Sequence, residues 1–177
     1  MKEIPWNDAI TLMSPHPYAL ATALDEEGKA NAIGLGWWTI VSWEPPMIAI
    51  AVGPGRYSHG CIEHSEEFAL CLPSREMAKA AWMCGTKTGR KVDKFEVGGL
   101  EAVPSKVIKP PLIGGSTVAF ECRVKEHLTT GDHTLFVAEV VATHGEPGRP
   151  EHLYSIHYKK LVSLSNEGAA DFLIEHK

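Results

Sequence analysis

Two short segments combine residue types that bind an anion. In the first, Arg56 and Ser58 follow a Gly-Pro-Gly turn, and Ser58 is the predicted N-cap of a short helix over residues 60–64. The unpaired N–H groups at a helix start favour phosphate, and an arginine adds two further donors. The pattern therefore predicts either an anion site or an ordinary capped helix beside a solvated arginine.

The second segment is the run TKTGRKVDKF, residues 86–95, in which basic side chains surround Thr88 and Gly89. Phosphate is held by hydroxyls, backbone N–H groups and cations together, and this run offers all three. The alternative is a solvated basic loop, which is what most charge runs are. Because the chain has a net charge of −5, a second local group of cations favours the phosphate interpretation; its members are Lys87, Arg90, Lys91 and Lys94.

A third stretch suits a planar ligand. Two strand-like runs, residues 30–38 and 46–53, flank a polar segment at Thr39–Glu44 that is surrounded by Trp37, Trp38 and Trp43. The following Pro45-Pro46 pair cannot continue a helix and favours extended backbone before it, which predicts a stiff loop with spare N–H groups. The alternative is that the three tryptophans simply build a core or an oligomer interface.

Composition limits the classes of function. With 177 residues, 44% of them hydrophobic and 22% charged, the chain is expected to form one domain over residues 1–177. Its scattered Lys and Arg residues suggest neither a nucleic-acid face nor a membrane face. The N-terminal segment has no apolar signal region, and the longest apolar run, Met47–Val52, is too short to span a bilayer. We therefore expect a cytoplasmic protein.

The cysteines predict neither a disulfide framework nor a metal site. Four cysteines are spread along the chain without a C-x-x-C pair. Cys61 and His64 have helical spacing, but no second close pair of ligands accompanies them. The chain also lacks the G-x-G-x-x-G fingerprint of dinucleotide-binding folds, so any nicotinamide must bind in another geometry.

The chain reads mainly as antiparallel strands. The clearest hairpin joins an alternating run from Val118 to Val124, through a turn at residues 129–132, to a strand over 134–143. The other expected strands are 18–24, 30–38, 47–52, 68–72, 100–103, 106–109 and 161–164. The expected helices are 9–13 with Asp8 as cap, 75–84 stopping at Gly85, and 168–175. Hairpins interrupted by a few helices favour a small antiparallel barrel.

Three motifs together resemble the flavin reductase-like, or flavoredoxin-type, family. They are NAIGLGWWTIVSWEPP at residues 31–46, RYSHGCIEHSEEF at 56–68 and CGTKTGRKVDKF at 84–95, and the tripeptide GDH at 131–133 adds to them. The resemblance covers about residues 18–144. It implies an antiparallel Greek-key split β-barrel with a few short helices, and a homodimer that binds FMN at or near the subunit interface.

The same resemblance assigns roles to individual residues. It implies that the isoalloxazine ring lies against Thr39, Ile40, Val41 and Ser42, largely through their backbone groups. Either Trp37 or Trp38 is the candidate to exclude water from that ring. It implies that the phosphate is held by Arg56, Ser58, Thr88 and Lys94. His133 is the candidate nicotinamide or flavin contact, and its alternative is a turn histidine without a redox role.

The sequence thus predicts an FMN-binding oxidoreductase that moves hydride or electrons between NAD(P)H or another donor and flavin or another acceptor. In such enzymes the cofactor carries the redox chemistry and the protein supplies binding and orientation. Two alternatives remain open. One is a flavoredoxin-type electron carrier that receives electrons from a protein partner and has no nicotinamide turnover. The other is a non-redox dimer module that binds a different ligand.

Overall fold

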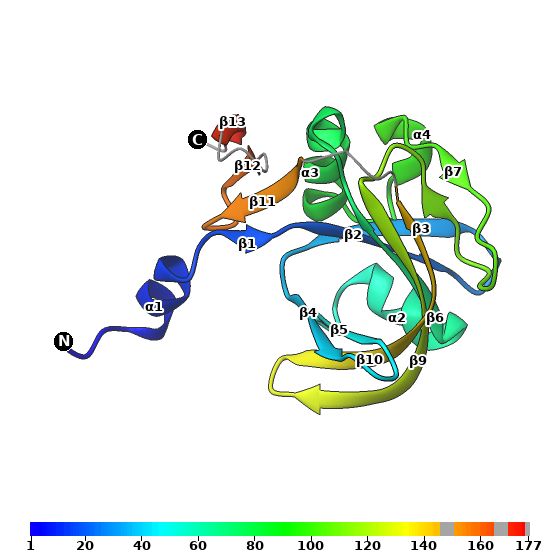
Figure 1. The fold of residues 1–177 in the computed structure, drawn as a ribbon, viewed down its shortest axis with the longest axis horizontal. Helices are drawn as coiled ribbons and strands as arrows, with labels where there is room; N and C mark the ends of the chain where they lie inside the picture. Colours follow the sequence, from blue (N-terminus) through cyan, green and yellow to red (C-terminus); the bar gives the residue numbers. More distant parts are fainter. Residues whose placement is uncertain (146–150, 165–169, 176–177) are drawn as a thin grey trace.

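The computed structural model describes residues 1–145, 151–164 and 170–175 and is built mainly from antiparallel strands (Figure 1). The strands are β1 His16–Pro17, β2 Ala19–Leu24, β3 Ala30–Leu35, β4 Trp38–Ser42, β5 Met47–Val52, β6 Glu67–Leu72, β7 Ala102–Val103, β8 Leu112–Ile113, β9 Val118–Thr130, β10 His133–Gly145, β11 His152–Ile156, β12 Lys160–Leu164 and β13 Ala170–Glu175. The helices are α1 Trp6–Leu12, α2 Tyr57–Ser65, the 3-10 helix η1 Arg75–Met77, α3 Ala78–Thr86 and α4 Lys94–Gly98.

The main sheet has seven strands in the order β3-β2-β6-β9-β10-β5-β4. The long β9–β10 hairpin lies between β5 and β6, which are neighbours in the sequence, and this gives a Greek-key order. Register shifts between Val137 and Ala138 and between Val140 and Ala142 mark irregularities in the hairpin, and such bulges bend a sheet. The strands curl around α2, while β3 and β4 remain as the two edges of the split barrel (Figure 1).

Strand periodicity explains why the sheet has a core on each face. In β6, Phe68 and Leu70 pack inside the curl with α2, whereas Ala69 and Cys71 pack on the opposite face with α3. Successive side chains of a strand point to opposite faces, so a strand buried on both sides reads as a continuous apolar run. The apolar run Met47–Val52 in β5 is mostly buried, as this pattern indicates.

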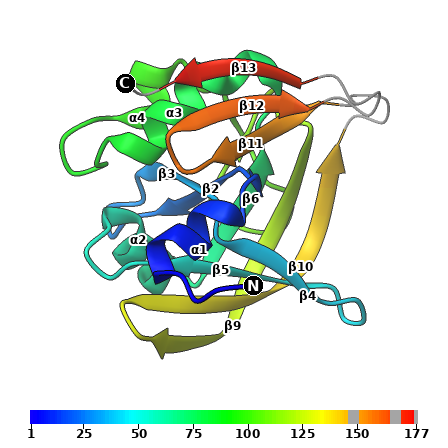
Figure 2. The same ribbon diagram turned by 90° about the vertical axis from the view of Figure 1, so that its left-hand side faces the viewer.

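The C-terminal strands form a second sheet in the order β1-β11-β12-β13, which lies next to α3 (Figure 2). The predicted C-terminal helix over 168–175 is wrong where it is described, because residues 170–175 form β13 and pair with β12. Residues 168 and 169 lie outside the described part. Pairing with an available sheet edge has overridden local helix preference here.

Three other local predictions are corrected. Helix α1 begins at Trp6 after Pro5, whose carbonyl accepts from the N–H groups of Asp8 and Ala9 at 3.1 Å, so Asp8 lies in the first turn and is not the cap. Helix α3 continues past Gly85 to Thr86. Residues 106–109 form no strand, because the backbone N–H groups of residues 106–108 donate to the buried carboxylate of Glu121 at 2.7–3.0 Å.

Candidate functional site

The two basic segments meet at one pocket of about 190 Å³, which we call the cationic pocket. Its lining contains Ile33, Gly55, Arg56, Tyr57, Ser58, Cys84, Gly85, Thr86, Lys87, Thr88, Gly89 and Lys94. All four residues assigned to phosphate by the resemblance are therefore on the wall of a single cavity. They come from the start of α2, the segment after α3, and the start of α4.

Helix α2 places Ser58 differently from the prediction. The helix begins at Tyr57 and Arg56 is its N-cap residue, so Ser58 lies within the first turn. The Ser58 side chain is buried and its Oγ accepts a hydrogen bond from Asn31 Nδ2 at 2.7 Å. Because that bond occupies the oxygen as an acceptor, the hydroxyl proton can be donated to a ligand. Sequence reasoning missed Asn31, whose only signal is a polar residue within an apolar strand.

Lys94 is held in place by main-chain carbonyls of two other elements. Its Nζ donates to the carbonyl oxygen of Ala32 at 2.6 Å and to that of Cys84 at 2.8 Å, and the residue is only 3% exposed. Burial lowers the pKa of Lys94, and the nearby positive charge of Arg56 acts in the same direction. The two bonds use two of the three donors of the ammonium group, which fixes the charge at the pocket wall.

The loop between α3 and α4 fits closely against the barrel because residue 89 is glycine. A Cβ atom at Gly89 would lie 2.2 Å from Asn31 Oδ1 and 2.6 Å from Tyr57 Cδ1. Real side chains do not tolerate such distances, so any larger residue must displace the loop. Gly89 thereby sets the position of Thr88 on the pocket wall.

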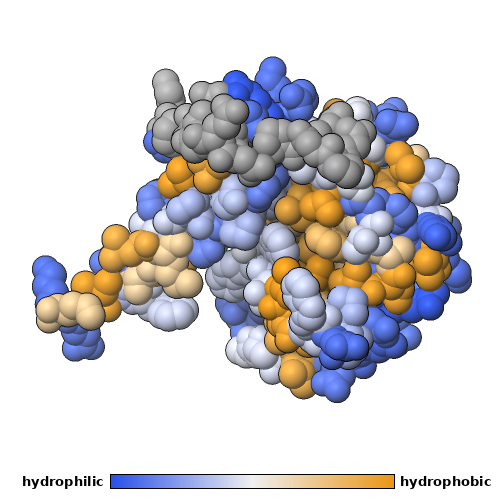
Figure 3. All heavy atoms as spheres, viewed as in Figure 1, coloured by the Kyte–Doolittle hydropathy of each residue, from blue (hydrophilic) through white to orange (hydrophobic). Residues whose placement is uncertain are grey.

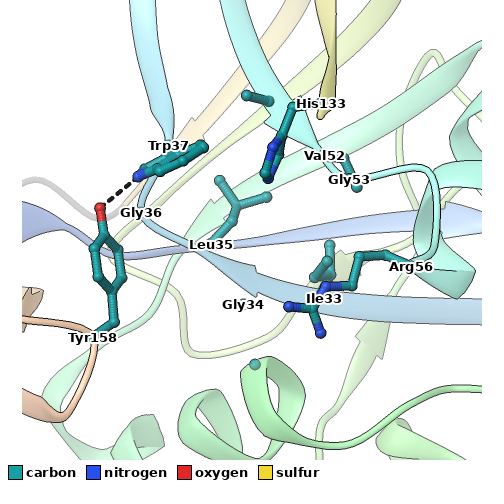
Figure 4. A pocket seen from close by; sticks show the side chains of 12 residues that line it. Ile33, Gly34, Leu35, Gly36, Trp37, Val52, Gly53, Arg56, His133 and Tyr158 are labelled. Carbon is teal, nitrogen blue, oxygen red and sulfur yellow. Dashed lines mark hydrogen bonds between the residues drawn. The ribbon is translucent and has the colours of Figure 1, made fainter. Parts of the chain in front are cut away.

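A second pocket of about 220 Å³ adjoins the first and shares Ile33, Arg56 and Gly85 with it. We call it the glycine-lined pocket; the rest of its lining is Gly34, Leu35, Gly36, Trp37, Ala51, Val52, Gly53, His133 and Tyr158 (Figure 4). The absence of a Cβ atom at Gly34 and Gly85 makes room for the hydroxyl of Tyr18, and much of the wall is glycine backbone and apolar side chains. A flat ring system suits such a surface.

Polar and aromatic groups surround the glycine-lined pocket. His133 comes from the start of β10, its ring lies 4.6 Å from that of Trp37, and its Nδ1 is 2.7 Å from Asp132 Oδ1. The hydrogen bond from His133 lowers the pKa of Asp132. On its other side, Trp37 donates from Nε1 to the hydroxyl of Tyr158 (Figure 4). Sequence reasoning missed Tyr158, which carries no local signal because it lies far along the chain.

The structure does not place Thr39, Ile40, Val41 and Ser42 in either pocket. The predicted stiff loop at 39–44 is wrong for its first part, because residues 38–42 form β4 and pair with β5. Trp38 Nε1 donates to the carbonyl of Pro17 at 3.0 Å, which ties this strand to the N-terminal segment. Ile40 and Ser42 instead line a separate apolar pocket of about 270 Å³.

The two adjoining pockets fit a ligand with an anionic end and a planar end. The cationic pocket supplies a guanidinium, two ammonium groups, hydroxyls and the start of α2, where the His59 N–H donates to the Arg56 carbonyl at 3.0 Å and the earlier N–H groups have no side-chain cap. Arg56 lies between the anionic and planar ends of such a ligand, since it lines both pockets.

Other kinds of site are not visible in the described part of the chain. Residues 1–145, 151–164 and 170–175 contain no group of three or more His, Cys, Asp and Glu side chains placed to hold a metal ion. The four cysteines are free and buried, and burial raises the pKa of Cys71 to about 11. Among the described helices, none has the length and apolar character needed to cross a membrane.

Comparison with known proteins first defines the class. Over 100% of its length the chain is similar to the solved structure of a flavoredoxin from Methanosarcina acetivorans, of which it covers 94%, with 28% sequence identity and a TM-score of 0.76. This likeness confirms the predicted antiparallel split barrel. Residues 12–162 match the family model described as a flavin reductase like domain, and the chain belongs to this family.

Relatives in sequence agree with this assignment. The chain is 36% identical to a protein of Archaeoglobus fulgidus over 159 residues, which is 86% of this chain and 88% of that protein. It is 28% identical to the NADH-dependent FAD reductase of Streptomyces globisporus over 135 residues, which is 75% of this chain and 73% of that protein.

Proposed function

We propose that this protein is an FMN-binding oxidoreductase that moves hydride or electrons from NAD(P)H, or from another donor, to flavin or to an acceptor. The observation that supports it most is the convergence of Arg56, Ser58, Thr88 and Lys94 on one cavity that opens onto a glycine-lined pocket. These residues come from segments up to 38 positions apart in the sequence. Membership of the flavin reductase-like family identifies flavin as the class of ligand.

In this proposal the phosphate of FMN occupies the cationic pocket. Arg56 and Lys94 supply positive charge, while the hydroxyls of Ser58 and Thr88 donate hydrogen bonds to the phosphate oxygens. Three or four charge-assisted hydrogen bonds, at about 1.5–3 kcal/mol each, are sufficient for micromolar binding or tighter.

The planar end of FMN then lies in the glycine-lined pocket, and one of its edges faces the strand β4. As an edge strand, β4 presents alternate N–H groups away from β5, and these remain our proposed contacts from Thr39–Ser42 to the ring. When bound, FMN supplies the redox chemistry, and the protein binds it, orients it and excludes water. Trp37 lies beside His133 at the pocket and is bonded through Nε1 to the hydroxyl of Tyr158, and in this proposal the pair covers the ring (Figure 4).

His133 is the proposed contact for the nicotinamide or the flavin. It lines the glycine-lined pocket beside Trp37, and the Asp132 carboxylate fixes its ring through Nδ1. The nitrogen Nε2 therefore faces the neighbourhood of Gly53, where a Cβ atom would lie 3.7 Å away. The name of the Streptomyces relative, an NADH-dependent reductase, supports a nicotinamide as donor.

The test uses the purified full-length protein. We expect it to bind FMN, with the visible absorbance of bound flavin and quenching of flavin fluorescence. Anaerobic addition of NADH or NADPH is expected to bleach that absorbance. Failure to bind FMN under any refolding condition would contradict the proposal.

A second candidate is a flavoredoxin-type electron carrier. It is favoured by the likeness to the Methanosarcina flavoredoxin over the whole chain and by the lack of a dinucleotide fingerprint. The anaerobic experiment separates the two candidates. FMN that is not bleached by either nicotinamide, but is reduced by a protein donor, identifies the carrier.

We also propose that the protein acts as a homodimer. Helix α1 stands away from the body of the chain and buries none of its residues, with Trp6 73% and Leu12 75% exposed (Figures 1 and 3). Exposed apolar side chains of this kind mark an interaction surface. In this proposal α1 of one copy binds a second copy of the chain at β4, where apolar residues are exposed and the apolar pocket around Ile40 is located. Light scattering is expected to give a dimer mass, and a larger monomer fraction for the double variant Trp6→Ser/Leu12→Ser.

A further inference from the structure

A third pocket, of about 410 Å³, lies on the other side of Tyr57 from the cationic pocket. Tyr57 lines both cavities and therefore forms the wall between them. The third pocket is otherwise lined by Asp25, Glu26, Glu27, Gly60, Cys61 and Arg90, and we call it the acidic pocket.

The wall between the two pockets is held from several sides. The hydroxyl of Tyr57 donates to Asp25 Oδ2 at 2.8 Å, and the guanidinium of Arg90 lies 5.4 Å from the centre of the Tyr57 ring. Arg90 Nη1 also donates to the carbonyl oxygen of Gly55 at 3.3 Å, so the arginine bridges from the loop after α3 to the start of α2. Gly89 packs against the same ring. Tyr57 and Arg90 thus form one partition.

The two sides of the partition have opposite charge. Three cations, Arg56, Lys87 and Lys94, line the cationic pocket. Three carboxylates and the single guanidinium of Arg90 line the acidic pocket. The arrangement favours an anion that ends at the partition and opposes an anion that continues past it.

We propose that this partition and the acidic pocket make the protein selective for FMN over FAD. The inference rests on the proposed function and adds the residues that discriminate between the two flavins. The phosphate of FMN is a terminal monoester with a charge of about −1.5 to −2 at neutral pH, which matches the cations of the cationic pocket. The corresponding phosphate of FAD has one ester bond and one anhydride bond, so it carries a single charge, and it is followed by a second phosphate and an adenosine.

The extra part of FAD meets an obstacle on this side of the molecule. To continue past Tyr57, it must displace Arg90 and bring the second phosphate among the carboxylates of Asp25, Glu26 and Glu27. If the second phosphate and the adenosine avoid these carboxylates, they extend into solvent, where no protein contacts offset the conformational entropy that they lose on binding. Both routes lower the affinity for FAD relative to FMN.

The test measures the dissociation constants of FMN, FAD and riboflavin by quenching of flavin fluorescence. The main variant is Glu26→Gln/Glu27→Gln, because both residues are exposed and neither lines the cationic pocket. Asp25 is left unchanged because it also accepts from the backbone N–H groups of Glu27 and Lys29. The matched control is Glu3→Gln/Glu126→Gln, which changes the net charge equally at exposed positions away from the three pockets.

We expect the wild-type protein to bind FMN at least about tenfold more tightly than FAD. Each carboxylate a few ångströms from a phosphate opposes it by roughly 1 kcal/mol in water, about fivefold in affinity. The main variant is therefore expected to bind FAD about 5- to 25-fold more tightly, with FMN within twofold of wild type and no change in the control.

Equal wild-type affinities for FMN and FAD would overturn the selectivity while leaving the proposed function intact. The same holds if the ratio of the two affinities is unchanged in the Glu26→Gln/Glu27→Gln variant. Absence of binding of any flavin to the wild-type protein would overturn the proposed function itself, and the selectivity with it.

Discussion

Replacement of Arg56 by alanine tests the proposed phosphate site most directly. Arg56 is exposed and lines both the cationic and the glycine-lined pocket. Loss of one charge-assisted hydrogen bond costs about 1.5–3 kcal/mol, so the affinity for FMN is expected to fall by about 10- to 150-fold. The free energy of unfolding of the ligand-free protein is expected to change by less than about 0.5 kcal/mol, because substitutions of exposed residues usually do.

Quenching of flavin fluorescence, titrated with FMN and with riboflavin, measures this effect. Riboflavin lacks the phosphate, so its affinity is expected to stay within about threefold of wild type. Lys91→Ala is the matched control, since Lys91 is exposed in the same basic segment but does not line the cationic pocket. Its effect on FMN is expected to be small and to decrease further with added salt.

Two results would refute the reasoning about Arg56. One is an unchanged affinity for FMN in the Arg56→Ala protein. The other is an equal loss of affinity for FMN and riboflavin, which would place the guanidinium against the ring system and not against the phosphate.

Three further substitutions test the surroundings of the site. Lys94→Met leaves two buried carbonyls without their donor and is expected to cost about 3 kcal/mol in the free energy of unfolding, measured with urea, in addition to weakening FMN binding. Gly89→Ala introduces a Cβ atom 2.2 Å from Asn31 Oδ1 and is expected to cost about 1–3 kcal/mol and to weaken FMN binding; full stability and affinity would contradict the close fit. Burial alone would raise the pKa of Glu121, but hydrogen bonds from three backbone N–H groups and His144 hold it below its ordinary value of 4.5. Because the pKa of Glu121 is lower in the folded protein, the ionised carboxylate stabilises the fold above pH 4.5, and this stabilisation is lost as the pH falls below that value. Glu121→Gln is therefore expected to lower the free energy of unfolding by about 2–3 kcal/mol at pH 7 and by progressively less at acidic pH. A loss of stability that does not depend on pH would refute the ionic role.

Much of the fold could be predicted because its signals are local. The run Met47–Val52 coincides with β5, and the alternation from Val118 onward predicted the β9–β10 hairpin with its turn at Gly131. Side-chain alternation and turn chemistry are carried by neighbouring residues, so they are readable before folding.

Predictions failed where a distant segment decided the outcome. Residues 38–42 pair with β5, and residues 170–175 pair with β12, although neither segment was assigned to a strand pairing from its own sequence. Residues 106–108 look like a strand, yet their N–H groups bond to Glu121 on β9. In each case a partner far along the chain satisfies the backbone groups, and local preference is too weak to oppose it.

The candidate site shows the same division. The sequence by itself determined which residues could hold an anion, because arginine, lysine and serine in two short motifs define that chemistry. Only the tertiary structure decided that Arg56 and Lys94 line one cavity, that Asn31 orients Ser58, and that Tyr57 separates the cationic from the acidic pocket. The physical reason is that residue type fixes what a side chain can bind, whereas strand pairing and helix packing fix which side chains share a cavity.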